Sequence, residues 1–311
     1  MYQFFVEPHQ VGQEYISILG DDVNHIKNVL RMKIGTCIRI SVKDKFEHTE
    51  NFLKQNSGKN IENNQRVQYE KQKGELDNKD SEKLQKEMSF FGTIDHISDK
   101  EVIVKIESQD ENGTELSNRI YLFQGLPKGD KMELIIQKAV ELGVYQIIPV
   151  AMKNCVVKLD DKKAASKIKR WQAISESAAK QSKRTIIPEI KMPLSWKLAL
   201  KEAENLDIVL VPYENERGMQ ATREILQNIK QGQSIGIFVG PEGGFSEEEI
   251  ESIAPVQVLY KADAVNKTDT IETETAEKNT TYHRISLGRR ILRTETAGLA
   301  TLSMLVFCLD E

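Results

Sequence analysis

Apolar positions change their spacing along the chain, and the change divides it into two parts. Near the start and again at 89–106, apolar and polar residues alternate in short runs, as in strands. Further on, an apolar run at 120–123 is followed by a helical pattern at 132–140 and a second run at 145–150. Because strand, helix and strand in this order favour parallel pairing, an α/β domain is predicted there.

Two polar segments interrupt these patterns. Residues 54–87 hold few large apolar side chains, so they cannot bury enough surface to offset the entropy of ordering. We interpret them as a flexible insertion in a small β-barrel domain at 1–115. A second segment at about 261–283, rich in Thr, Lys and Glu, interrupts an α/β domain at 119–311.

Helix boundaries are indicated by capping residues. Asp130 with Glu133, and Ser246 with Glu249, have the spacing of a capping box, which predicts a helix start at each place. The last helix, at 297–309, is apolar nearly all round. Such helices are buried, either in a core or against another subunit.

A glycine-rich loop, 240–244, lies between the apolar run at 235–239 and the helix predicted after Ser246. Ligands bind at the carboxyl edge of open α/β sheets, and glycine lets the backbone approach them closely. The loop lacks the Lys-Ser/Thr of a phosphate-binding loop and carries Glu242, which favours a neutral or cationic ligand over a nucleoside triphosphate. A plain turn is the alternative interpretation.

Composition narrows the class of protein. The 311 residues are 39% hydrophobic and 29% charged with a net charge of -4, so the chain is not a uniformly basic nucleic-acid binder. A local stripe at 153–184 nevertheless has ten Lys or Arg against three acids, a net +7. The three cysteines lack metal-site spacing, and no apolar stretch is long enough to span a membrane. We therefore expect a cytoplasmic protein without a metal site or membrane contact.

A second loop, 286–297, combines a glycine bend, three arginines and a glutamate directly before the last helix. With the glycine-rich loop it resembles the SPOUT class of RNA methyltransferases, and most closely the RsmE family. The resemblance runs through most of the chain in the family's order, at 4–6, 25–32, 125–131, 141–143, 156–159, 170–171 and 178–182.

The resemblance implies a SPOUT-type parallel sheet with a C-terminal trefoil knot, after an N-terminal PUA-like barrel that binds RNA. It also implies S-adenosylmethionine as the methyl donor, N3 of a uridine in the 16S ribosomal RNA of the small subunit as the acceptor, and a homodimer formed through the last helix. The knot follows only from the resemblance, because true knots are too rare for a pattern of residues to predict.

The family's motifs assign candidate residues by position. The cofactor would be bound by three loops, with main-chain groups reading the adenine and apolar side chains forming the walls: Tyr213, Glu214, Gly240, Pro241, Glu242, Gly243, Gly244, Leu287, Gly288, Ile291 and Leu292. The RNA would be bound by the basic stripe and by the barrel, for which the candidates are His25, Arg31, Lys158, Lys180 and Arg184.

Arg293 and Glu295 are the catalytic candidates. Uracil N3 carries a proton and is a poor nucleophile until it loses it. An arginine near a uracil carbonyl oxygen would stabilise the developing anion, and a carboxylate would accept the proton. The alternative is that Arg293 and Glu295 form a structural pair at the helix start.

Two positions depart from the family's pattern. Gln3 stands where an arginine is common, and Asn154-Cys155 stands where a basic residue and a serine are common. Either departure weakens the case for RNA contact, which leaves two rivals: a tRNA-modifying SPOUT enzyme and a ribosome-associated RNA-binding protein without turnover. A dinucleotide oxidoreductase is a distant third, because no Gly-x-Gly-x-x-Gly with a following acidic residue is present.

Overall fold

The structure is a computed structural model, and it describes residues 1–43, 88–111, 113–253 and 280–310. They belong to two compact units, Met1–Thr114 and Glu115–Glu311, which are described one at a time. The insertion predicted at 54–87 lies outside the described residues. So does most of the polar segment predicted at 261–283, although its last residues, from Thr281, belong to a strand.

The N-terminal unit is built on one five-stranded sheet in the order β1-β3-β4-β5-β2. All neighbours pair antiparallel except β1 with β3, which are parallel. The strands are β1 (Gln3–Val6), β2 (Tyr15–Leu19), β3 (Cys37–Val42), β4 (Ser89–Ile97) and β5 (Glu101–Gln109). Three short helical segments accompany them: η1 (Pro8–Gln10), α1 (Asp21–Asn24) and η2 (His25–Val29).

Alternating apolar residues of these strands form the core of the unit. Phe4 pairs in register with Ile40, and both are buried together with Ile16, Ile38 and Ile94. The strand patterns predicted at 36–42, 89–94 and 102–106 are therefore confirmed as β3, β4 and β5, because the alternation places one apolar set on the core face.

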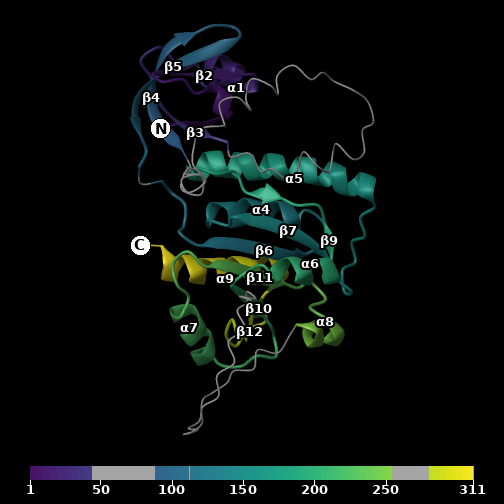
Figure 1. Cartoon of the computed structure of the whole chain (residues 1–311). Helices are drawn as coiled ribbons and strands as arrows, with labels where there is room; N and C mark the ends of the chain where they lie inside the picture. The colour runs from purple at the N-terminus through teal and green to yellow at the C-terminus, as the bar shows by residue number, and fades with distance from the viewer. Residues whose placement is uncertain (44–87, 112, 254–279, 311) are drawn as a thin grey trace, which may run out of the picture. The chain divides into compact units, whose positions relative to one another are not determined.

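The C-terminal unit is an α/β fold around a parallel sheet in the order β12-β10-β11-β6-β7-β8, with β9 also pairing with β7 (Figure 1). Every pairing in this sheet is parallel. The strands are β6 (Arg119–Gly125), β7 (Gln146–Ala151), β8 (Glu189–Ile190), β9 (Leu194–Ser195), β10 (Ile208–Pro212), β11 (Ser234–Val239) and β12 (Thr281–Ile285).

Helices cover both faces of this sheet. On one face, α4 packs against α5 and α9, and α9 packs against β11 and α7. On the other face, Phe123 and Phe238 stack with ring centroids 4.3 Å apart and belong to one buried cluster with residues of α6 and α8. The helices are α4 (Lys131–Glu141), α5 (Asp161–Ser182), α6 (Trp196–Ala203), α7 (Gln220–Gln227), α8 (Glu247–Ser252) and α9 (Thr294–Leu309).

One of the two predicted capping boxes forms. Ser246 and Glu249 exchange side-chain-to-backbone hydrogen bonds of 3.2 and 2.8 Å at the start of α8. At the start of α4, however, the Asp130 side chain makes no cap hydrogen bond, and the Glu133 carboxylate accepts instead from Arg170 of α5 at 2.8 Å. The prediction of a capping box at Asp130 was therefore wrong, although the helix begins where it was placed.

The last helix starts three residues before the predicted Ala297 and is not buried all round. Leu302 and Leu305 are fully buried, whereas Phe307 is 89% exposed. None of the helices in the described part of the chain combines the length and apolar character that crossing a bilayer needs.

Candidate functional site

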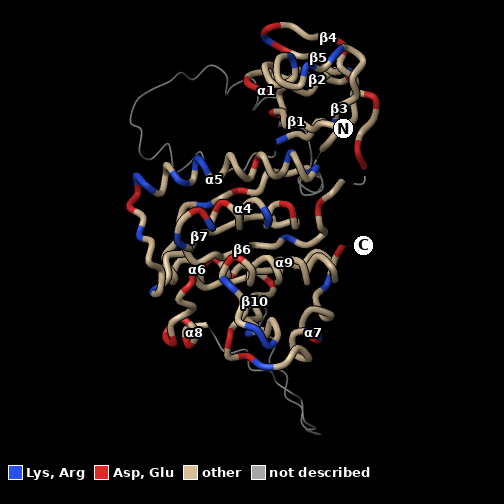
Figure 2. Tube along the Cα trace, turned by 180° about the vertical axis from the view of Figure 1, so that it is seen from behind, with Lys and Arg blue, Asp and Glu red and all other residues tan. Residues whose placement is uncertain are grey.

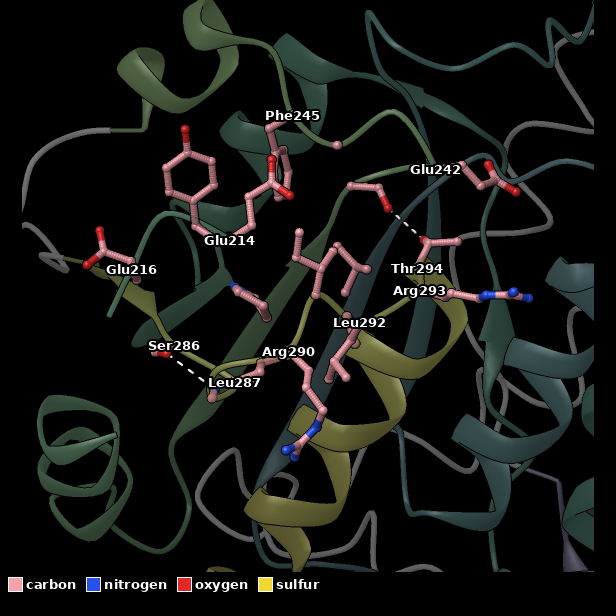
Figure 3. A pocket seen from close by; sticks show the side chains of 18 of the residues that line it. Glu214, Glu216, Glu242, Phe245, Ser286, Leu287, Arg290, Leu292, Arg293 and Thr294 are labelled. Carbon is pink, nitrogen blue, oxygen red and sulfur yellow. Dashed lines mark hydrogen bonds between the residues drawn. The ribbon is translucent and has the colours of Figure 1, made fainter. Parts of the chain in front are cut away.

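The carboxyl ends of β10, β11 and β12 lead into three loops that surround one cavity. Because these strands are parallel neighbours, their following loops meet at one edge of the sheet. The cavity measures about 350 Å³ and is lined by residues 212–214, 216–217, 239–242, 244–245 and 286–294, with Lys131 and Ala297 added from α4 and α9. Figure 3 shows Glu242, Leu287, Leu292 and Thr294 arranged around this space.

The glycine-rich loop is shaped by close backbone contacts. A side chain at Gly240 would meet the backbone of Gly244 and Phe245 at 3.1–3.3 Å, and Gly244 itself has φ +67°. In the opposite loop, Gly288 has φ +102°. These positions favour glycine, and all three residues line the cavity.

Thr294 ties the glycine-rich loop to the first turn of α9. Its hydroxyl donates to the carbonyl oxygen of Gly240 at 2.6 Å and accepts from Nε2 of Gln124 at 2.9 Å (Figure 3). Both Thr294 and Gln124 are buried. One hydroxyl thus joins three segments that are far apart in the sequence.

Lys131 joins the glycine-rich loop to α9 at the other side of the cavity. Its Nζ lies 3.0 Å from Oε1 of Glu242 and 3.3 Å from Oε2 of Glu295. The hydrogen bond to Glu242 raises the pKa of Lys131 above its usual value. Burial works to raise the pKa of Glu242, but the bonds from Lys131 and from backbone amides outweigh it, and that pKa is lowered. Both groups are therefore charged at neutral pH.

The structure brings ten of the eleven predicted cofactor residues to this cavity; the exception is Gly243. The carbonyl oxygen of Gly243 accepts a hydrogen bond from the side chain of Asn154 at 3.0 Å, outside the lining. Ile291 lines the cavity but is 81% exposed, so it belongs to the mouth and not to an enclosed wall.

Arg293 and Glu295 flank the first turn of α9 but do not pair with each other. Arg293 occupies the N-cap position and lines the cavity, with an exposed side chain. The Glu295 carboxylate, 16% exposed, faces Lys131 instead. Within the described part of the chain there is no ion pair between Arg293 and Glu295, so the alternative of a structural pair is not what the structure shows.

Arg184, predicted to contact RNA, is buried. Its side chain is 4% exposed and makes an ion pair with Glu115, whose carboxylate also accepts from the backbone of Thr185 at 2.8 Å. The guanidinium donates further to the carbonyl oxygens of Val140 and Val144, at 3.1 and 2.6 Å. This prediction is therefore corrected: Arg184 holds the end of α5 to its neighbours and presents no charge to solvent.

Blue Lys and Arg positions recur along α5 in Figure 2, but carboxylates from other segments pair with some cations of the basic stripe. Lys153 pairs with Glu248, and Arg170 pairs with Glu133. Within the stripe, Lys163 pairs with Asp160, and the candidate Lys180 pairs with Glu176 at 3.1 Å. The candidate Lys158 is exposed. The acids of the last two pairs, Asp160 and Glu176, are already counted in the net +7. Glu248, Glu133 and Glu115 lie outside the stripe, so the net +7 still overstates the charge available to a polyanion.

The two RNA candidates of the N-terminal unit lie together around η2. His25 begins η2, and Arg31, with φ +50°, follows it. Both side chains are exposed, and the His25 ring meets Phe4 edge to face at 6.4 Å. Their exposure leaves them available to a ligand.

The two departures from the family's pattern have local structural roles. Gln3 is buried and donates to Ser41 Oγ at 3.2 Å inside the N-terminal unit. Asn154 donates to the carbonyl oxygens of Gly243 and Gly244 at 3.0 and 3.2 Å and so braces the glycine-rich loop.

Several cavity residues were not among the sequence candidates. Lys131 lies within the matching segment at 125–131, and Thr294 stands between the two catalytic candidates, so the motifs contained a signal for both. The motifs contained no signal for Arg217. It follows Tyr213 and Glu214 in the loop after β10, and the pairing of β10 with β11 and β12 brings that loop to the cavity. Arg289 and Arg290 were visible as part of an arginine-rich loop but were given no role.

Comparisons with known proteins agree with this geometry. A family model described as an RNA methyltransferase domain matches residues 114–259. The chain is 33% identical over 313 residues to the Ribosomal RNA small subunit methyltransferase E of Bacillus subtilis (strain 168), covering 99% of this chain and 96% of that protein.

Two solved structures are similar over nearly the whole chain. One, described as a hypothetical protein, is 30% identical with a TM-score of 0.70 and covers 99% of this chain and 98% of that one. The other is a putative methyltransferase from Legionella pneumophila in complex with the bound cofactor SAM. It is 25% identical with a TM-score of 0.64, and covers 98% and 97% of the two chains.

Proposed function

The chain belongs to the ribosomal RNA small subunit methyltransferase E family, and from this premise we propose that it methylates N3 of one uridine in the 16S ribosomal RNA of the small subunit, with S-adenosylmethionine as donor. The observation that carries the proposal is the cavity at the carboxyl edge of β10, β11 and β12, where the predicted cofactor loops converge.

The residues of the cavity suit this cofactor. The glycine-rich loop and Leu287-Gly288 line the cavity, where main-chain groups can hydrogen-bond a purine edge, and Leu292 supplies an apolar wall. Carboxylates at Glu214 and Glu242 suit a ligand that carries positive charge. When bound, the cofactor would supply an electrophilic methyl group on a sulfonium.

Arg293 and Glu295 are proposed to prepare the uracil. The Glu295 carboxylate would accept the proton from N3, and the Arg293 guanidinium would donate to a uracil carbonyl oxygen as the anion develops. The lone pair on N3 freed by this proton transfer would be the nucleophile for the methyl group, and the sulfur would leave as a neutral thioether with the electron pair of the broken carbon–sulfur bond. Lys131, whose Nζ lies 3.3 Å from Oε2 of Glu295, would hold this carboxylate in place.

The assembly around this reaction is proposed from the same family membership. We propose that the N-terminal unit is a PUA-like barrel that contacts RNA near His25 and Arg31, and that the chain passes through a trefoil knot near its C-terminus. The exposed side of α9, including Phe307, would lie in a homodimer interface. A ribosomal substrate places the protein in the cytoplasm.

A direct test is to incubate the purified protein with labelled S-adenosylmethionine and small ribosomal subunits lacking the modification, and to map methylated nucleosides by mass spectrometry. We expect 3-methyluridine at one site of the 16S RNA. Label on transfer RNA alone would favour the tRNA-modifying alternative. Cofactor binding without any transfer would favour a non-catalytic RNA-binding protein, and either result would reject the proposal.

A further inference from the structure

Four arginines surround the mouth of the cavity: Arg217, Arg289, Arg290 and Arg293. The side chains of all four are exposed. Arg217 follows β10, whereas the other three follow β12, so the two neighbouring strands bring them to one edge of the sheet. Figure 3 shows Arg290 and Arg293 extending in different directions from the turn that precedes α9.

The charge of these arginines is not neutralised within the described residues. None of the four forms an ion pair there, although carboxylates are near. Glu216 is taken by Arg284 at 3.3 Å, and Glu242 is taken by Lys131. Of the three carboxylates that line the cavity, only Glu214 has no ion pair in the described part of the chain.

The basic stripe at 153–184 offers no more unpaired cations than the mouth of the cavity. Its cations are largely held by carboxylates or, for Arg184, buried, as described above. Lys158, Lys162 and Lys169 are the clearest exposed cations of the stripe that form no ion pair in the described part of the chain. The two surfaces therefore present similar numbers of unpaired cations, but only one of them adjoins the proposed reaction site.

We propose that Arg217, Arg289 and Arg290 bind the phosphates that flank the target nucleotide, and that the basic stripe at 153–184 contributes little to RNA affinity. The inference rests on the proposed function, since it assigns the phosphate contacts of that same site. Arginine suits the role because its planar guanidinium donates two parallel hydrogen bonds to one phosphate. Phosphate contacts beside the cavity would fix the register of the nucleotide that enters it.

Two charge-matched triple variants separate the surfaces. One replaces Arg217, Arg289 and Arg290 with Gln, and the other replaces Lys158, Lys162 and Lys169 with Gln. Affinity for small ribosomal subunits lacking the modification is measured between 50 and 200 mM salt, because each lost contact to single-stranded RNA lowers the slope of log affinity against log salt by about 0.7. Calorimetry with S-adenosylmethionine shows whether each variant keeps its cavity.

We expect the arginine variant to lose about two units of this slope and the lysine variant to bind like wild type, with cofactor affinity retained in both. An equal or larger loss in the lysine variant would overturn the inference. It would also be overturned if the arginine variant bound subunits normally but lost cofactor affinity, which would assign these side chains to the cofactor.

Results that reject the proposed function can be told apart from results that reject the role of the arginines. If the wild-type protein binds the subunits but transfers no methyl group, the proposed function is wrong, while the comparison of slopes still decides the role of the arginines. If the wild-type protein shows no affinity for the subunits even at 50 mM salt, both are overturned.

Discussion

The hydroxyl of Thr294 donates to the carbonyl oxygen of Gly240 at 2.6 Å, across 54 residues of sequence. The hydroxyl oxygen of Thr294 also accepts from Nε2 of Gln124, so the hydroxyl both donates and accepts a hydrogen bond inside the protein. The cavity therefore depends on a buried bond between the first turn of the last helix and the glycine-rich loop.

Thr294→Val should weaken cofactor binding. The change keeps the shape but leaves the Gly240 carbonyl and the Gln124 amide without this partner, at a cost of about 1–3 kcal/mol. We expect the dissociation constant for S-adenosylmethionine in calorimetry to rise roughly tenfold, which corresponds to about 1.4 kcal/mol. Thr294→Ser, which keeps the hydroxyl, is the control. Wild-type affinity in the valine variant would contradict the assigned role.

Lys131→Met should shift the pH dependence of methyl transfer. Without the ammonium, Glu242 loses the hydrogen bond and the positive charge that help to lower its pKa, so the pKa of this carboxyl rises. The acid limb of the kcat profile is expected to move to higher pH, and Lys131→Arg should restore it. Identical profiles for wild type and Lys131→Met would show that Lys131 has only a structural role.

Arg293→Ala and Glu295→Gln should impair transfer while sparing cofactor binding. Removal of one donor to a developing anion costs about 10²–10³ in rate, and removal of a general base costs about 10²–10⁴. Single-turnover rates with subunits, measured beside cofactor affinity, test both. A rate within threefold of wild type for either variant would remove that residue from the proposed chemistry.

Arg184→Gln should destabilise the protein and not act through RNA. The substitution leaves the buried Glu115 carboxylate without its cation, and breaking a buried pair costs about 3–5 kcal/mol. Thermal melting of the full chain should show a large drop for this variant. The exposed Lys162→Gln is the matched control and should melt like wild type. A normal melting temperature with lost RNA affinity would restore Arg184 as an RNA contact.

His283, in β12, should make stability depend on pH. Burial lowers the pKa of this imidazole below its usual 6.5 in the folded protein. The unfolded chain then binds a proton near pH 6.5 that the folded protein does not, so the free energy of unfolding falls as pH drops through that value. His283→Gln should flatten the change in melting temperature between pH 7.5 and 5.5. If the melting temperature of His283→Gln changed with pH as much as that of wild type, the His283 imidazole would contribute nothing to the pH dependence.

Local patterns predicted local structure well. The strand at 235–239 was predicted from one short apolar run, and the Ser246–Glu249 capping box from two residues within one helical turn. The Asp130–Glu133 box had the same spacing and did not form, since Arg170, 37 residues away, holds the Glu133 carboxylate. No local pattern contains that competitor.

The site was predicted where it rests on the family's motifs and missed outside them. Tyr213, Gly240 and Leu287 belong to recognisable loops. Arg217 follows Tyr213 in the loop after β10 but lies in no recognised motif, and the pairing of β10 between β11 and β12 brings this loop to the cavity. Arg184 shows the converse limit. A count of charges along 153–184 cannot separate a buried guanidinium from an exposed one, because its partner, Glu115, lies on another segment.

The bond from Thr294 to Gly240 also has a consequence for biosynthesis. A chain made from its N-terminus completes the glycine-rich loop well before it completes β12 and the turn that leads into α9. Until these last residues are added, the cavity lacks one wall and the Gly240 carbonyl lacks its partner. A nascent chain that has not yet reached β12 therefore lacks part of the cofactor cavity.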